Sequence, residues 1–388
     1  MLRAMVAGGV ATALPTVIAQ EATAAPRTTN SSLAGYYIGG NGRLYAAGAT
    51  TAGAVSTAVI GPAGGNVSTV QRSDGVVAVF TIGSHGGLLA GFGSAGGSGM
   101  SFVRHSQGGL ATPGGKIAAV EGQTGTHVHF TGTNGAIYHA MFARSGAVSI
   151  GPAPVVLPGS VLPSTSLAAF RVGDRFGVAY VGGNGSIQVS AGSIGMGGSG
   201  PIAVWTTTAA TPANAAPRAA PVAAASESNR VAAFYTGTDG SLWRIPFSGV
   251  TPQPQVALSG PGAVPLGAHL AATLAPTGEF AVTYAGADGA INAATNAYGP
   301  RADPWIITPP AVHAPGNPLA LTYGGDDYLY VGWCGNDIWF WLIWWWLRRP
   351  FPVPPPPDPF HELQEITSPI LTRPGFNVSI PQLGAARR

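Results

Sequence analysis

One pattern of apolar and polar positions recurs along most of the chain. An alternating apolar run is followed by a Gly-x-Asn/Asp-Gly segment and then by a second short apolar run. Asn-Gly and Asp-Gly between two apolar runs predict a β-hairpin, because both residues tolerate the positive φ angles of a type I′ turn. The predicted turns fall at positions 42, 86, 135, 185, 240, 289 and 337, the last with Asp337 where Gly is expected.

The spacing of these turns predicts the fold. Successive turns are separated by 44 to 55 residues, which leaves room for two more short strands in each unit. In the fourth unit these strands are expected at 166–172 and 201–206. Four strands per unit at this period are typical of a β-propeller blade. We therefore predict an all-β fold, a seven-bladed β-propeller with four antiparallel strands per blade, over residues 31–380. A solenoid of stacked hairpins is the alternative.

The start of the chain resembles an export signal. Arg3 supplies a positive charge, residues 4–19 are mostly apolar, and Ala22-Thr23-Ala24 fits a small-residue cleavage site. We predict that residues 1–25 are an export signal peptide and that the protein is secreted or held at the cell surface. A flexible Ala-rich terminus is the alternative. No stretch has the roughly 18 apolar residues that a membrane-spanning helix needs.

The end of the chain is expected to close the ring. A proline-rich excursion at 350–360 is predicted to be extended and exposed. Strand-like runs follow at 363–371 and 376–380, before a tail at 381–388. Because the first unit has little before residue 31 to form an inner strand, we expect 376–380 to supply it and to protect an open edge. A frayed tail is the alternative.

Composition narrows the functional classes. The chain has 58 Gly and 34 Pro, but 46% of its 388 residues are hydrophobic and 9% are charged, which argues against disorder. Its net charge of +3 is spread out, so no nucleic-acid footprint is visible. Arginine supplies all its basic side chains except Lys116, the single lysine. The single cysteine, Cys334, excludes an internal disulfide framework and a Cys-based zinc site.

The fifth repeat, residues 231–243, resembles the blade motif of bacterial propeller lectins and tectonin-like repeat proteins. The resemblance implies sugar binding where aromatic and polar side chains of the blades meet a glycan. The aromatic position after the turn is occupied by Tyr45, Tyr138, Trp243 and Trp339. It is replaced in three repeats, by Leu89, Gln188 and Asn292. This loss implies fewer equivalent sugar sites.

Two pairs of neighbouring residues are the strongest ligand-binding candidates, Trp243 with Arg244 and Tyr138 with His139. An aromatic face can stack on a sugar ring while an adjacent donor reaches its hydroxyl groups. Tyr45 and Trp339 complete the predicted set. The alternative is that these aromatic side chains pack between blades. The Asn and Asp residues of the repeats are explained by turn geometry.

Three histidines form a possible metal set. His127 and His129 alternate on one face of a predicted strand, and His139 lies on the partner strand. Imidazoles bind zinc and copper. However, no carboxylate has a fitting spacing, and ordinary strand alternation explains the pattern. We predict no metal and no cofactor.

The segment 338–349 contains five of the nine tryptophans, followed by Arg348 and Arg349. It is too short to span a bilayer, although Trp and Arg suit a membrane interface. Two interpretations remain open: the core of the last blade, or a surface that contacts a partner, a membrane surface or a polysaccharide. The predicted contact residues are Trp341, Trp344, Trp345 and Trp346.

These observations predict a secreted, non-catalytic binding protein with lectin-like recognition of a glycan or cell-surface polysaccharide, as a monomer or small oligomer. The alternative is a secreted or envelope-associated scaffold that binds another protein through 338–349. A glycosidase is the third hypothesis, and it would need two suitably spaced carboxylates, which no recognisable motif supplies.

Overall fold

The computed structural model divides the chain into two compact units, Met1–Ser32 and Leu33–Arg388. The structure describes part of the second unit only. The described residues are 34–48, 52–94, 99–197, 200–227, 229–274, 278–295, 304–308, 310, 313, 319–323, 328–334, 338–344, 360–366 and 382–383. The predicted export signal, the seventh turn at 337, the excursion at 350–359 and the strand at 376–380 lie outside them.

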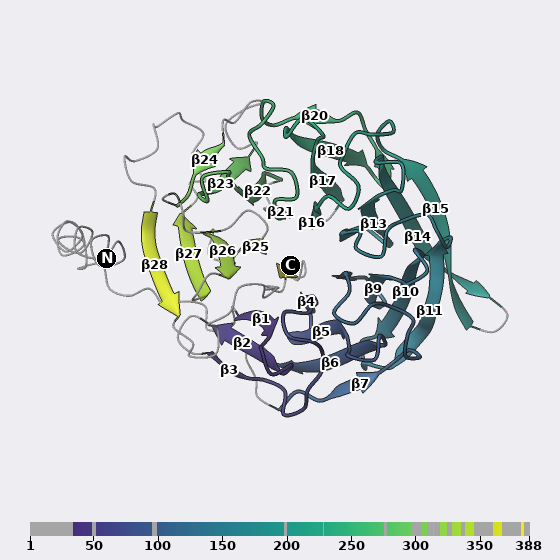
Figure 1. Ribbon diagram of the computed structural model, residues 1–388. Coiled ribbons are helices and arrows are strands. Elements are labelled where there is room, and N and C mark those ends of the chain that lie inside the picture. The colour runs from purple at the N-terminus through teal and green to yellow at the C-terminus, as the bar shows by residue number, and fades with distance from the viewer. Residues whose placement is uncertain are drawn as a thin grey trace. The chain divides into compact units, whose positions relative to one another are not determined.

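The described strands form six sheets of four or five strands, the blades, and one sheet of three strands (Figure 1). The first blade contains β4 (Val67–Gln71), β5 (Val76–Ile82), β6 (Leu88–Ser94) and β7 (Phe102–Arg104). The second blade contains β8 (Ile117–Glu121), β9 (Gly125–Thr131), β10 (Ile137–Ala143) and β11 (Val148–Val156). The third blade contains β12 (Leu167–Val172), β13 (Arg175–Val181), β14 (Ile187–Gly197) and β15 (Gly200–Ala209). The fourth blade contains β16 (Val222–Glu227), β17 (Arg230–Thr236), β18 (Leu242–Ser248), β19 (Thr251–Pro252) and β20 (Val256–Ala257).

The fifth blade contains β21 (Leu270–Leu274), β22 (Phe280–Ala285), β23 (Ile291–Thr295) and β24 (Trp305–Ile306). The sixth blade contains β25 (Leu319–Tyr323), β26 (Tyr328–Cys334), β27 (Ile338–Trp344) and β28 (Phe360–Ile366). The three-stranded sheet consists of β1 (Ala34–Ile38), β2 (Leu44–Gly48) and β3 (Ala52–Ala54). A short C-terminal strand, β29 (Gln382–Leu383), joins the first blade.

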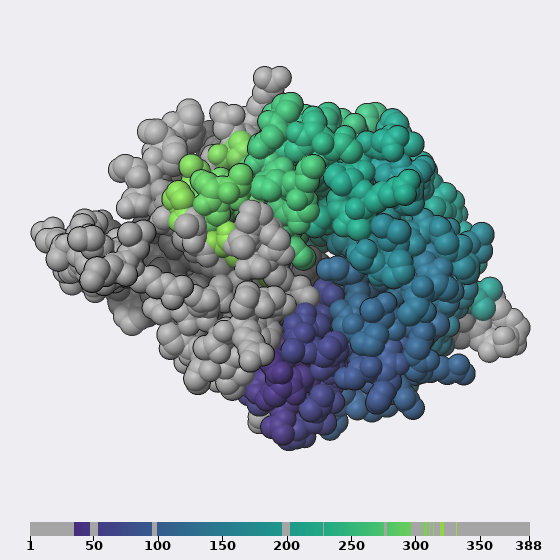
Figure 2. Space-filling view, viewed as in Figure 1, coloured from purple at the N-terminus to yellow at the C-terminus, as the bar shows by residue number. Residues whose placement is uncertain are grey.

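The blades follow one another around a common centre. Their inner strands contact in the order β4, β8, β12, β16, β21 and β25, and the neighbouring blades pack closely in the space-filling view (Figure 2). β29 contacts β25 and pairs in parallel with Val70 and Gln71 of β4. Six inner strands and β29 therefore complete the ring within the described residues.

The predicted all-β propeller is confirmed, but the prediction of seven blades is wrong. The first hairpin forms only the three-stranded β1–β3 sheet, which has no inner fourth strand among the described residues. The C-terminal strand that completes the ring is Gln382–Leu383, from the expected tail, and it pairs with β4 rather than with β1. The repeat in the sequence predicted the number of hairpins correctly. A blade also needs an inner strand, however, and the inner strands carry no repeated motif that would predict their number.

The hairpins are present, but the six turns that the structure describes are not of type I′. In the turn at 42, Gly42 N donates to Gly39 O at 2.9 Å, and Gly39 N donates to Arg43 O at 2.9 Å. Gly42 has φ +76°, whereas Asn41 has no positive φ. This is a type I turn followed by a left-handed glycine bulge. The same two hydrogen bonds recur in the turns at 86, 135, 185, 240 and 289.

The Asn and Asp residues of these turns have the structural role that their position predicted. Asn41 Oδ1 accepts from Arg43 N at 3.1 Å. Equivalent bonds are made by Asn134, Asn184, Asp239 and Asp288. Each side-chain oxygen satisfies a backbone amide two residues ahead, which stabilises the turn.

The core lies between the sheets and contains many small residues. Between the β12–β15 and β16–β20 blades, Ala168, Ala179, Ala224 and Ala233 pack with Phe170 and other apolar side chains. Small side chains allow neighbouring blades to approach closely, and the larger rings fill the remaining volume. In the described part of the chain, no helix is long and apolar enough to cross a membrane.

Candidate functional site

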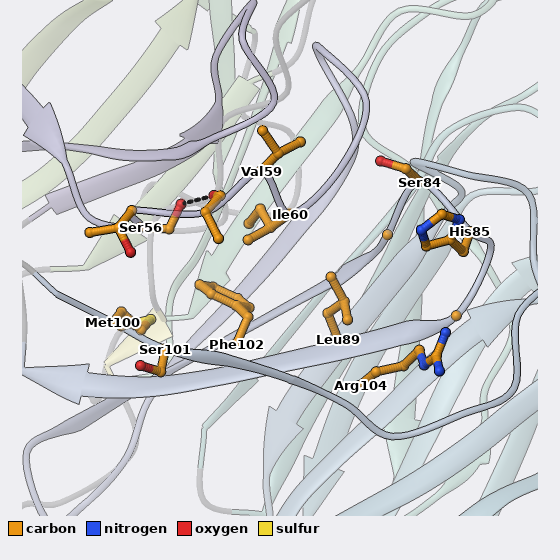
Figure 3. Close-up of a pocket in the computed structure, with 14 residues that line it drawn as sticks. Ser56, Val59, Ile60, Ser84, His85, Leu89, Met100, Ser101, Phe102 and Arg104 are labelled. Atoms are coloured by element: carbon orange, nitrogen blue, oxygen red, sulfur yellow. Dashed lines mark hydrogen bonds between the residues drawn. The ribbon is translucent and has the colours of Figure 1, made fainter.

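A pocket of about 460 Å³ lies between the β1–β3 sheet and the first blade. Three segments supply its lining: 56–60 after β3, the β5–β6 turn with Leu89, and 100–104 at β7. Figure 3 shows Phe102 and Leu89 side by side beneath Ile60, so the middle of the pocket is apolar.

The two ends of the pocket are polar. His85 and Arg104 lie at one end, and Ser56 and Ser101 at the other (Figure 3). The side chains of His85 and Arg104 are exposed, whereas Phe102 and Leu89 are half-buried. Ser56 Oγ accepts from Leu44 N at 2.8 Å and donates to Ala58 O at 3.0 Å, which fixes this wall to the β1–β3 sheet. The arrangement offers one aromatic surface and several hydrogen-bonding groups to a small polar ligand.

Phe102 is held in place by a glycine on the neighbouring strand. Gly91 pairs with Phe102, and a Cβ at Gly91 would lie 2.8 Å from Phe102 Cζ. A methyl group there would therefore displace the ring. Val103 alternates with Phe102 and Arg104 along β7 and is 56% exposed, so it is absent from the pocket lining.

Sequence reasoning did not identify this pocket. Its lining comes from segments that neither repeat nor share a motif, and the repeat position that it uses is Leu89, where the expected aromatic residue is lost. One local signal was available in the alternation of Phe102 and Arg104, which directs both side chains to one face of β7.

The predicted aromatic positions fold back over their own turns. A Cβ at Gly39 would lie 2.5 Å from the ring of Tyr45, and a Cβ at Gly132 would lie 2.5 Å from the ring of Tyr138. Tyr45 is 4% exposed and stacks on Tyr37 at 5.5 Å between ring centroids.

Tyr138 and Trp243 remain half-buried. Tyr138 stacks on Phe130 at 5.5 Å between centroids, and its hydroxyl accepts from Asn134 Nδ2 at 3.0 Å. The indole of Trp243 lies over Gly237, where a Cβ would be 2.9 Å from its Nε1. Of the described aromatic side chains predicted to bind a ligand, these two keep some accessible surface.

The structure does not bring the members of either candidate pair together. Trp243 packs toward the β12–β15 blade, whereas the Arg244 guanidinium lies 4.8 Å from the ring centroid of Phe280, on the next blade. Tyr138 packs toward the first blade, whereas His139 contacts Phe176 of the β12–β15 blade. Neighbouring strand residues point to opposite faces, so each pair is divided. Their individual roles in ligand binding stay predictions.

The tryptophan-rich run is part of a blade where it is described. β27 (Ile338–Trp344) pairs with β26 on one side and with β28 on the other. Trp339, Trp341 and Trp344 lie on this strand, for which the structure describes the backbone alone. Trp345 and Trp346 lie outside the described residues.

The three histidines form a buried cluster between two blades. His127 Nδ1 and His139 Nε2 are 3.0 Å apart, a hydrogen bond, and His127 stacks on Phe176 at 3.6 Å between centroids. His129 pairs with His139 across β9 and β10 and contacts the edge of Trp205. The predicted placement of these residues on one face is therefore confirmed.

Burial keeps these imidazoles neutral. Burial lowers the pKa of His139 to about 3. It also lowers the pKa of His127 and His129 well below the ordinary value, with nearby positive charge as a smaller cause. Among the described residues, no group of three or more His, Cys, Asp or Glu side chains could hold a metal ion. Through their contacts with Phe176 and Trp205, the three imidazoles contribute to packing between the two blades.

No known protein-family model matches the chain, and no curated protein matches its sequence. Several solved structures have the same fold. The BP39L lectin from Burkholderia pseudomallei aligns with a TM-score of 0.65 and 19% identity over 81% of this chain and 88% of that one. AofleA from Arthrobotrys oligospora aligns with a TM-score of 0.54 and 12% identity over 79% of this chain and 87% of that one.

The Aleuria aurantia lectin aligns with a TM-score of 0.50 and 16% identity over 72% of this chain and 92% of that one. It is described as a six-bladed β-propeller with a novel mode of fucose recognition. Identities this low establish the fold alone. The chain therefore shares the β-propeller fold of these structures, with six blades among its described residues.

Proposed function

We propose that this protein is a secreted, non-catalytic lectin and that the pocket between the β1–β3 sheet and the first blade is its principal sugar site. The observation that supports this most directly is the half-buried Phe102 ring beside the exposed Arg104 and His85. The apolar face of a sugar ring stacks on an aromatic side chain while charged and hydroxyl groups bind its hydroxyls. The lectin fold of the neighbouring structures adds support. Export and membership of the tectonin-like family remain predictions.

Fucose-containing glycans are the first ligands to test, because one of the structural neighbours is a fucose-recognising lectin. Residues 26–388 would be screened on a glycan array, and the strongest binder measured by calorimetry. Phe102→Ala and Arg104→Ala should each weaken binding about tenfold or more, which corresponds to loss of a stacking contact or a charged hydrogen bond.

Val103→Ala is the matched control, because Val103 lies on the same strand and faces away from the pocket. It should bind as the wild type does. Trp243→Ala tests the site predicted on the fifth repeat. If Trp243→Ala removes binding while Phe102→Ala and Arg104→Ala retain it, the protein is a lectin but the pocket is not its site. Silence across the array for the folded wild type would contradict the lectin proposal and favour the protein-binding scaffold.

A further inference from the structure

The residues that directly precede the inner strands lie together at one end of the ring's centre. They are Asn66 before β4, Lys116 before β8, Ser166 before β12, Pro221 before β16 and His269 before β21. All five are half-buried. Because the inner strands contact one another in succession and start their blades in the same way, their first residues form one polar rim. We call these five residues the entry rim.

Lys116 is the only lysine of the chain, and it lacks an acidic partner among the described residues. Its ammonium group donates to Asn66 Oδ1 at 3.3 Å, while the Asn66 amide donates to Gly114 O at 2.6 Å. A partly buried cation bound only by a neutral amide lacks charge compensation.

The other titratable group of the entry rim, His269, does not compensate the charge of Lys116. Burial lowers the pKa of His269 to about 4, and the positive charges of Lys116 and His313 contribute to this shift. Burial also lowers the pKa of Lys116. Lys116 and His269 precede inner strands of blades that are not neighbours, β8 and β21, and the charge of Lys116 still disfavours the protonated form of His269.

The opposite ends of the same inner strands carry both signs of charge. Glu121 Oε1 accepts from Ser73 N at 2.9 Å and from Ser73 Oγ at 2.8 Å. Arg171 donates through Nη1 to Glu121 O at 3.5 Å. Burial raises the pKa of Glu227, and the charge of Arg171 opposes that change. At these described strand ends, unlike at Lys116, acidic and basic side chains lie close to one another.

We propose that the entry rim binds a small oxyanion, with Lys116 as the principal charge and Asn66 and His269 as flanking hydrogen-bond donors. A phosphate, a sulfate or a carboxylate would accept the ammonium donors that Asn66 leaves unused and would neutralise the buried charge. The oxyanion is either a free ion or the acid group of an acidic sugar. This site is separate from the Phe102 pocket and does not rest on the proposed sugar site.

The single lysine provides a direct measurement. Reductive methylation with ¹³C-formaldehyde labels Lys116 and the chain's N-terminal amine, which are distinguished in NMR spectra by their pH dependence. Titration with inorganic phosphate should shift the Lys116 signal saturably and raise the pKa of its amine. Sodium chloride at matched ionic strength should not. If chloride and phosphate give the same non-saturating shift, the proposal is wrong.

Variants test the assignment on the unlabelled protein by calorimetry with inorganic phosphate. Lys116→Met should weaken binding about tenfold or more, as expected for loss of a charge-assisted hydrogen bond. Arg218→Met removes an exposed cation outside the rim and should leave binding unchanged, as should Phe102→Ala. Equal affinity in Lys116→Met and the wild type would overturn the proposal. A parallel titration with glucuronate distinguishes the sources: tighter binding than phosphate indicates an acidic sugar, and weaker binding indicates a free ion.

Discussion

At the scale of single residues, the turn glycines are the positions most tightly constrained by geometry. Gly135 has φ +71°, and a Cβ there would lie 2.5 Å from Val161 O. Gly135 O also accepts from Val161 N at 3.1 Å, so the turn is joined to the segment leading into the next blade. Two independent constraints thus meet at one residue.

We expect Gly135→Ala to destabilise the protein by about 2 kcal/mol or more, because the left-handed conformation and the close carbonyl oxygen both oppose a side chain. The free energy of unfolding would be measured by urea denaturation. Gly151→Ala is the matched control, since Gly151 has no positive φ and a Cβ there would meet nothing within 4 Å. Equal stability of the two variants would show that the turn tolerates a side chain.

At the scale of elements, the contact between the β8–β11 and β12–β15 blades contains neutral histidines. Since their folded-state pKa values lie below that of a free histidine, the unfolded chain binds protons that the folded chain excludes. Stability from these residues is therefore complete above about pH 6.5 and is lost as the pH falls toward the folded pKa, about 3 for His139. Each such histidine contributes a slope of about 1.4 kcal/mol per pH unit.

We accordingly expect the free energy of unfolding to fall steeply between pH 6.5 and 5, a range in which few carboxylates titrate. Urea denaturation at several pH values measures this. His139→Phe should reduce the slope by about one proton, whereas Val103→Ala, which removes no titratable group from an exposed position, should leave it unchanged. A wild-type stability that is flat across this range would contradict the neutral buried cluster.

The hairpins could be predicted from the sequence because the Gly-x-Asn/Asp-Gly signal is local. The turn type could not, since the same residues serve both a type I′ turn and a type I turn with a glycine bulge. In the described turns only the final glycine of the Gly-x-Asn/Asp-Gly motif has a positive φ, as a type I turn with a glycine bulge requires. The inner strands have no motif of their own, so their number could not be read from the repeat.

The Phe102 pocket could not be predicted because its walls are brought together only by packing between sheets. Ser56, Leu89 and Phe102 belong to different segments, and Leu89 stands at the repeat position where the expected aromatic residue is lost. The same packing explains why the side chains of Trp243 and Arg244 lie apart. The sequence places them side by side, whereas the strand directs them to neighbouring blades.

At the scale of the whole ring, stability depends on the seam where the first and last parts of the propeller meet. β29 contacts β25 and pairs in parallel with β4. Without β29, the inner edge of β4 would be left open. An open edge loses backbone hydrogen bonds and becomes available to other chains.

We therefore expect removal of residues 382–388 to lower the free energy of unfolding by about 1–3 kcal/mol, the contribution of a few backbone hydrogen bonds. Urea denaturation measures the loss, and light scattering detects association through the exposed edge. The double substitution Gln382→Pro and Leu383→Pro keeps the tail length but removes both backbone donors, so it should reproduce the effect. A variant lacking only residues 384–388 should remain as stable as the wild type, because β29 is then intact. If the 382–388 deletion and the double proline variant unfold at the same urea concentration as the wild type, the ring holds together through the blade contacts alone. The pairing of β29 with β4 then adds nothing to its stability.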